Sequence, residues 1–173
     1  MDTTIKNSFL RRRRLALLLF FLCGCQSPNH WQVSHQKGSQ KEFDSARLSY
    51  PVRDKVNGVA VEMIYAKEGL RTYLEVHSQM IPPYQSDLKK ALVKIKTSGK
   101  TLQGVAHRHQ GGQRASLPHD LQQAIVDSLL GGHPVTIELI GYSTTLQPHD
   151  FALSYGELRK APLNIPLQLP FKL

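Results

Sequence analysis

Two histidines, His107 and His109, are the residues of this sequence best spaced for metal or acid–base chemistry. One residue separates them, so on a β-strand both imidazoles would lie on the same face. A zinc site needs three or four ligands, and no third ligand follows the pair at hairpin or helical spacing. The remaining ligands would have to converge from His77, His119, His133 or His149. The pattern favours solvated histidines beside Arg108 over a metal centre, and it predicts no cofactor.

A serine nucleophile is not indicated either. The chain lacks a Gly-x-Ser-x-Gly motif, and Ser143 is predicted to lie in a turn rich in hydroxyl groups. His149 and Asp150 are neighbours, and adjacent residues point apart on a strand and do not face each other on a helix. These residues therefore do not predict a catalytic triad.

Paired carboxylates and phosphate-binding loops are also missing as motifs. Glu138, Asp150 and Glu157 have no spacing that suggests joint acid–base work. The glycine pairs at 111–112 and 131–132 are interpreted as a loop and a helix end rather than as a phosphate cradle. The residue patterns predict no catalytic centre.

The front of the chain carries the most specific pattern. A basic segment with Lys6 and four consecutive arginines at 11–14 precedes the apolar octet LALLLFFL at 15–22. This order is typical of an export signal, and eight apolar residues are far short of the roughly 20 that span a bilayer as a helix. We therefore expect an export signal rather than a permanent transmembrane helix.

The next residues, Leu22-Cys23-Gly24-Cys25, complete a motif that resembles the lipobox of bacterial lipoproteins. The resemblance is confined to this short stretch. It implies cleavage after Gly24, a diacylglycerol on Cys25 and acylation of the freed amine. Gln26, where an Asp would favour the inner membrane, implies the periplasmic face of the outer membrane. The alternatives are an ordinary signal peptide with a coincidental cysteine, or a cytosolic basic protein.

Composition limits the rest of the chain. Removing residues 1–24 takes away five basic residues and one acidic residue, so the formal net charge falls from +9 to +5. Cys23 and Cys25 are the two cysteines, so the exported domain has no disulfide and needs its own hydrophobic core. No motif of a nucleic-acid-binding module occurs, and nucleic acid is not an expected partner.

The mature chain is expected to begin with a flexible tether at 25–47, because this stretch is polar apart from a few residues such as Trp31. Trp31 is compatible with the membrane interface or with docking on the domain. A single domain is expected at 48–173. It starts with two hairpins, one at 59–77 that turns at Lys67-Glu68-Gly69 and one at 91–109 that turns at Ser98-Gly99-Lys100.

Beyond the hairpins, apolar spacing of three and four predicts a helix at 116–130 with Ser116 as its cap. A strand is expected at 135–139 and a short helix around Phe151, Tyr155 and Leu158. The end of the chain, 163–173, alternates apolar and polar residues without a fault. It predicts an edge strand or an extended segment over the core.

These elements predict an α+β fold of five or six strands, mainly antiparallel β, as a small sandwich-like sheet of hairpins with one or two covering helices. The expected function is a non-enzymatic binding or assembly-accessory module of the bacterial envelope, anchored to the membrane through Cys25 and bound to an envelope protein. The alternative is a tethered enzyme or ligand-binding lipoprotein that acts on cell-wall or lipid substrates through His107 and His109.

Overall fold

A computed structural model describes residues 30–37, 44–52 and 54–160, and these residues form one nine-stranded sheet with two helices. Every strand pair is antiparallel, which confirms the predicted α+β fold class. The spatial order is β1-β2-β3-β4-β7-β6-β5-β8-β9. The elements are β1 (Gln32–Gln36), β2 (Ser45–Tyr50), β3 (Ala60–Ala66), β4 (Gly69–Glu75), β5 (Lys90–Thr97), β6 (Lys100–Arg108), β7 (Arg114–Ser116), α2 (His119–Leu130), β8 (Val135–Leu139), β9 (Tyr142–Leu146) and α3 (Phe151–Arg159).

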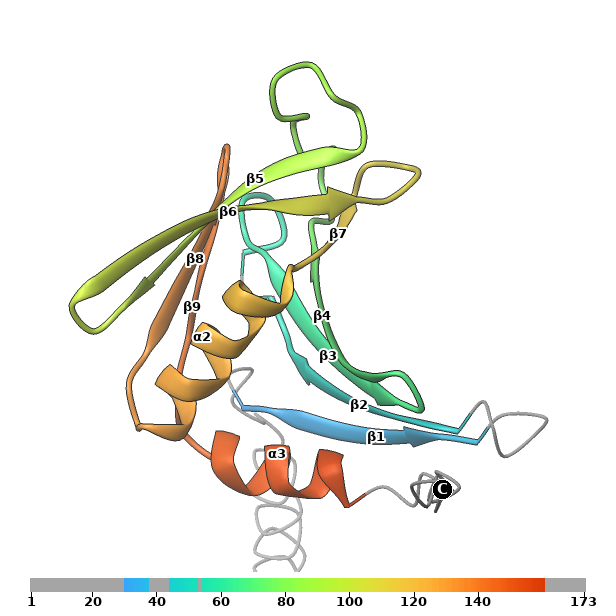
Figure 1. Ribbon diagram of the computed structural model, residues 1–173, viewed down its shortest axis with the longest axis vertical. Coiled ribbons are helices and arrows are strands. Elements are labelled where there is room, and N and C mark those ends of the chain that lie inside the picture. The colour runs from blue at the N-terminus through green and yellow to red at the C-terminus, as the bar shows by residue number, and fades with distance from the viewer. Residues whose placement is uncertain (1–29, 38–43, 53, 161–173) are drawn as a thin grey trace, which may run out of the picture.

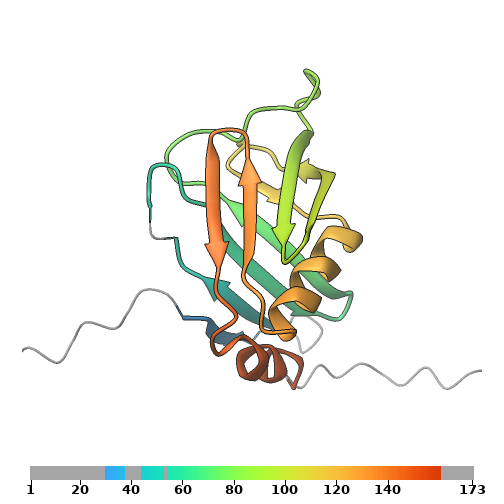
Figure 2. The same ribbon diagram turned by 90° about the vertical axis from the view of Figure 1, so that its left-hand side faces the viewer.

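The two predicted hairpins lie on either side of the short central strand β7, one in each half of the sheet. β3 and β4 pair up to Ala66 and Gly69, and β5 and β6 pair up to Thr97 and Lys100. Figure 1 shows the sheet bending sharply around α2, and Figure 2 shows β8 and β9 on the side facing the viewer. The short strand β7 joins the halves, because it pairs with β4 on one side and with β6 on the other.

The core lies between the concave face of the sheet and the helices. Alternate strand residues enter it, such as Val93 and Ile95 on β5, and both are fully buried. The helix α2 presents Leu121, Ile125 and Leu129 to the same core. Gly104 lets the helix approach β6, because an added Cβ would lie 2.9 Å from a methyl carbon of Leu121. We call this side of the sheet the helix-covered face.

The predicted helix at 116–130 is found, but it begins later than expected. Ser116 is the last residue of β7 and pairs with Tyr73 on β4 and His107 on β6, so it is held in the sheet and cannot cap a helix. The capping position belongs to Pro118, which makes no side-chain hydrogen bond. The prediction of Ser116 as the cap was wrong because β7 was not foreseen.

The predicted turn around Ser143 is instead a strand, β9, which pairs with β8 over its whole length. The chain reverses at Gly141, whose φ of +82° is readily adopted only by glycine. Tyr142 and Leu146 then point into the core. Ser143 and Thr145 take the alternating positions on the other face, so hydroxyl residues that resemble a turn here follow the two-residue period of a strand.

The expected tether at 25–47 is wrong for the part that the structure describes, since β1 and the start of β2 belong to the sheet. The folded domain therefore begins before residue 48. Trp31 is only 4% exposed, and its Nε1 donates a 2.9 Å hydrogen bond to the carbonyl oxygen of Gln147. Its ring lies 4.9 Å from that of Tyr50 and 4.8 Å from that of Phe151, centroid to centroid.

Polar composition misled this expectation because β1 is an edge strand. Most of its side chains are exposed, so a polar sequence satisfies it, and only Trp31 beside it is deeply buried. The short helix expected around Phe151 is confirmed as α3. The predicted export signal, Cys25 and the alternating tail at 163–173 lie outside the described residues.

Candidate functional site

The candidate site lies on the other side of the sheet, which we call the outward face; neither α2 nor α3 covers it. The register brings five polar or aromatic side chains into one transverse row across five strands. The cross-strand partners follow one another from β2 through β3, β4 and β7 to β6. The row consists of Ser49, Glu62, Tyr73, Ser116 and His107.

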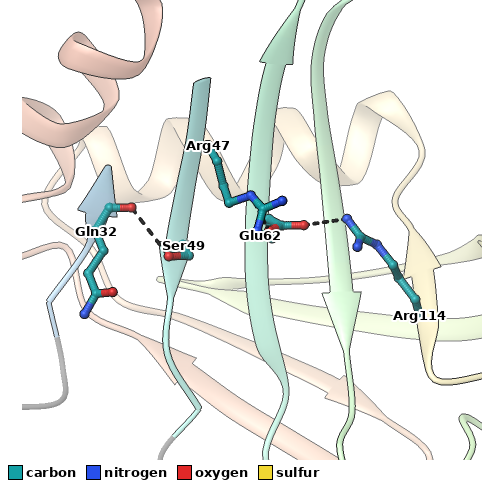
Figure 3. Close-up of polar contacts among 5 residues, drawn as sticks. All are labelled: Gln32, Arg47, Ser49, Glu62 and Arg114. Carbon is teal, nitrogen blue, oxygen red and sulfur yellow. Dashed lines mark hydrogen bonds and ion pairs between the residues drawn. The ribbon is translucent and has the colours of Figure 1, made fainter. Parts of the chain in front are cut away.

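Glu62 is the electrostatic centre of this row. Its side chain is 15% exposed and lies between two guanidinium groups, those of Arg47 on β2 and Arg114 on β7. Arg47 Nε is 2.9 Å from Glu62 Oε1, but the angle is not that of a hydrogen bond, so this contact is an ion pair. Arg114 Nη2 donates a hydrogen bond to Glu62 Oε2. Figure 3 shows the two arginines reaching Glu62 across the strands.

Arg114 also fixes an aromatic side chain of the row. Its guanidinium carbon lies 4.2 Å from the centroid of the Tyr73 ring, within the range of a cation–π contact. The planar guanidinium of Arg114 therefore binds the Glu62 carboxylate and covers the Tyr73 ring at the same time. Glu75 on β4 is the cross-strand partner of Arg114 on the same face, so two arginines and two carboxylates share this part of the face.

His107 and His109 extend the face beyond Tyr73. Their ring centroids are 5.0 Å apart and nearly perpendicular, and the Tyr73 and His109 rings are 5.8 Å apart. The two histidines thus share a face, as the alternation predicts. Burial, then the charges of His107 and Arg114, lower the pKa of His109 below its ordinary value of 6.5. His109 is therefore a neutral imidazole at pH 7, able to accept or donate a hydrogen bond or to bind a metal.

The His109 Nε2 atom is buried and makes no hydrogen bond to any residue that the structure describes. Its backbone is fixed, because the N–H donates to the carbonyl oxygen of Arg114 at 2.8 Å. Within the described residues, no three His, Cys, Asp or Glu side chains come together as a metal-binding group. The structure therefore brings the two predicted histidines together and does not add a third ligand to them from the part of the chain that it describes.

A hollow of about 440 Å³ adjoins Tyr73 on the same side of the sheet. It lies beside the β3–β4 hairpin, and Ile64 and Arg71 contribute to its walls. Arg71 pairs with Glu68 of the same hairpin, and both side chains are mostly exposed. The hollow is thus continuous with the aromatic part of the row and not with the core.

The remaining predicted groups are dispersed. His149 and Asp150 do contact each other, with Nε2 3.0 Å from Oδ2, so the expectation that these neighbours point apart was wrong. The contact forms because Asp150 has a φ of +59°, which is neither strand nor helix geometry. The His149–Asp150 pair is exposed and directly precedes α3 in the chain. Ser143 lies on β9, and Glu138 on β8 forms an ion pair with Lys96.

Comparison of the chain with protein-family models, with curated proteins and with solved structures finds no match. Neither of the helices in the described part of the chain is long and apolar enough to cross a membrane.

Sequence reasoning found the histidines of this site but missed its ionic centre. Arg47, Glu62 and Arg114 are 15 and 52 residues apart, and only the register of four strands brings them together. Arg47 also stood in the stretch expected to be a tether. The one signal in the sequence was Glu62, the single charge within an otherwise apolar strand pattern.

Proposed function

We propose that this protein is a lipid-anchored bacterial envelope protein whose outward face binds another envelope protein without catalysing a reaction. The lipobox Leu22-Cys23-Gly24-Cys25 supports the anchor, with lipid on Cys25. Three acyl chains give firm membrane attachment, since a single chain binds only marginally. Gln26 supports the periplasmic side of the outer membrane as the location.

The observation that carries the binding role is the arrangement of Arg114 between Glu62 and Tyr73. Arginine and tyrosine are enriched among the residues that dominate protein–protein binding, because they combine apolar area with directed hydrogen bonds. The contacts to Glu62 and Tyr73 already order the Arg114 side chain, so a partner would not have to bear the full entropy cost of ordering it.

The side chains of Arg47 and Arg114 keep about a third of their surface exposed, and their remaining hydrogen-bond donors indicate the chemistry of the partner. An acidic or carboxylate-bearing protein surface would complement Arg47 and Arg114, and the exposed edge of His107 offers a further polar contact. We therefore expect a partner that presents carboxylates around an apolar or aromatic centre. Nucleic acid is not part of the proposal.

Site-specific photo-crosslinking in the native membrane tests this proposal. A crosslinking residue replaces Val105, which lies on the outward face and is 41% exposed; the control position is Leu130, 47% exposed at the end of α2. We expect one protein of defined mass to crosslink from position 105 and not from position 130. Arg114→Ala should reduce this product at least tenfold, whereas Arg71→Ala, which removes an exposed arginine of the same face, should not.

An equal product from both positions, or equal effects of Arg114→Ala and Arg71→Ala, would contradict binding through this face. The anchor is tested separately by intact mass spectrometry of the membrane-bound protein and of a Cys25→Ala variant. A chain that begins at an acylated Cys25, and a variant that leaves the membrane, are the expected results. A chain that still begins at Met1 would contradict the proposed anchor.

A second candidate function is ligand binding or catalysis on cell-wall or lipid substrates by the same face. The neutral His109 beside His107 and the hollow next to Tyr73 favour it. The double variant His107→Ala with His109→Ala separates the two functions. Loss of function with an intact crosslink would support the ligand-binding role, and loss of the crosslink with no ligand bound would support the protein-binding role.

A further inference from the structure

We infer that α3, together with the end of the domain that contains Trp31, lies against the membrane that holds the lipid on Cys25. This inference rests on the lipid anchor proposed above and adds the orientation of the domain. The occupant of this surface is the phospholipid headgroup layer.

The connection between the anchored cysteine and the fold is short. Trp31 is docked in the core by its ring contacts and by its hydrogen bond to Gln147, so the fold begins there. Only residues 26–30 separate it from Cys25. Six residue steps span at most about 20 Å even when fully extended. Trp31 therefore stays within about 20 Å of the anchored cysteine.

Trp31 is also in direct contact with α3. Its indole packs against Phe151, the first residue of α3, so the helix starts directly beside the anchored end. Figure 1 shows α3 and β1 at one end of the molecule and the loop between β4 and β5 at the opposite end. The short connection holds the α3 end near the membrane and leaves the loop end far from it.

The outer surface of α3 suits such a contact. Leu153 is 74% exposed, the highest value among the exposed large apolar residues of the described chain. Arg159 and Lys160 are exposed at the C-terminal end of the helix, and Asp150 and Glu157 balance them. A near-neutral surface with one projecting leucine is expected to touch the headgroup layer without requiring anionic lipid.

Depth-dependent fluorescence quenching tests this orientation with matched leucines. Leu153→Cys and Leu88→Cys each introduce a thiol at an exposed leucine, 74% and 70% exposed, on α3 and on the β4–β5 loop. The mature lipoprotein has no other free thiol, because Cys23 is removed and Cys25 is lipidated. Each variant is labelled with bimane and reconstituted as the acylated full-length mature protein in phosphatidylethanolamine–phosphatidylglycerol vesicles that contain a headgroup-level lipid quencher.

We expect the label at position 153 to be quenched at least threefold more than the label at position 88. Equal quenching, or stronger quenching at 88, would overturn the inference. A second variant with 20 glycine and serine residues inserted after Gln26 should stay acylated and vesicle-bound but lose most of the difference between the positions. A difference that survives this insertion would show that the short connection does not set the orientation.

The outcome also separates this inference from the proposed anchor. Intact mass and vesicle flotation of the same samples report the anchor, and quenching reports the orientation. Acylated, floating protein without preferential quenching at 153 would overturn the orientation alone. Protein without the lipid mass that does not float would remove the anchor and the orientation with it. A headgroup contact at 153 that persists in vesicles of phosphatidylcholine, which carry no net charge, would support the neutral character of the surface.

Discussion

The two faces of the sheet are built from the same strands but held by different forces. The helix-covered face is apolar and closed by α2 and α3, whereas the outward face has an ion-pair group centred on Glu62 and is covered by neither of these helices. Burial of apolar area stabilises the first face, and side chains on the second face interact in partial contact with water. The difference indicates that the first face maintains the fold and that the second contributes less to its stability.

The largest expected effect comes from the same substitution made on each face. Val93→Ala removes two methyl groups from a fully buried position on β5, and Val105→Ala does so on the outward face of β6, where the side chain is 41% exposed. We expect Val93→Ala to reduce the free energy of unfolding by about 2–3 kcal/mol. Val105→Ala should change it by less than about 0.5 kcal/mol. Equilibrium urea unfolding measures both, and similar values would contradict the division into two faces.

Close packing on the helix-covered face is tested at Gly104. A methyl group there would lie 2.9 Å from Leu121 Cδ1, and Leu121 is buried, so it has little room to move. We expect Gly104→Ala to destabilise the protein by about 1–3 kcal/mol. The control is Gly156→Ala in α3, where no atom of the described residues lies within 4 Å of the added methyl group. That change should stabilise by about 0.5–1 kcal/mol, because alanine favours the helix. Thermal unfolding that shows the same sign for both would contradict this packing.

The ion-pair group on the outward face is tested at Glu62. Glu62→Ala leaves two partly buried guanidinium groups without their carboxylate, and we expect a loss of about 1–2 kcal/mol in the free energy of unfolding. Glu68→Ala breaks the exposed pair with Arg71 and should cost less than about 0.5 kcal/mol. Urea titrations at low and high salt check this. Equal losses for the two variants would make the group around Glu62 an ordinary surface contact.

The smallest expected effect is a pH dependence at His109. Its folded-state pKa is lowered below 6.5, first by burial and then by His107 and Arg114. The unfolded chain therefore takes up the proton more readily, so the contribution of His109 to stability is full above pH 6.5 and is lost as the pH falls below it. NMR titration of the imidazole should show the lowered pKa, and Arg114→Ala should raise it part of the way. His109→Gln should make stability less sensitive to pH between 6.5 and 5.

The sequence predicted the helix-covered face better than the outward face for a physical reason. Burial imposes a two-residue period on strands and a period of 3.6 on helices, so Val93, Ile95 and Leu121 are readable as core residues from local spacing. Contacts on the outward face depend on register between distant strands. The pair Arg47 and Glu62 becomes visible only when β2 is aligned with β3.

Edge strands were the other weak point of prediction. β1 has a polar sequence because most of its side chains face solvent, and β9 is rich in hydroxyl residues. Neither has the apolar alternation that identifies a half-buried strand. Trp31 carried the available signal, since a large aromatic residue next to a polar stretch is a candidate for docking on the domain, and that alternative is the one observed.

The three-residue strand β7 has a consequence for the order in which the sheet can form as the chain emerges from its N-terminal side. β4 emerges about 40 residues before its second neighbour, β7, and until then one of its edges is unpaired. Exposed strand edges recruit other chains, so this interval is a period of aggregation risk. Pairing with β7 ends that interval. Arg114 on β7 also binds Glu62 on β3, so the ion-pair group around Glu62 is completed together with the strand that joins the two halves of the sheet.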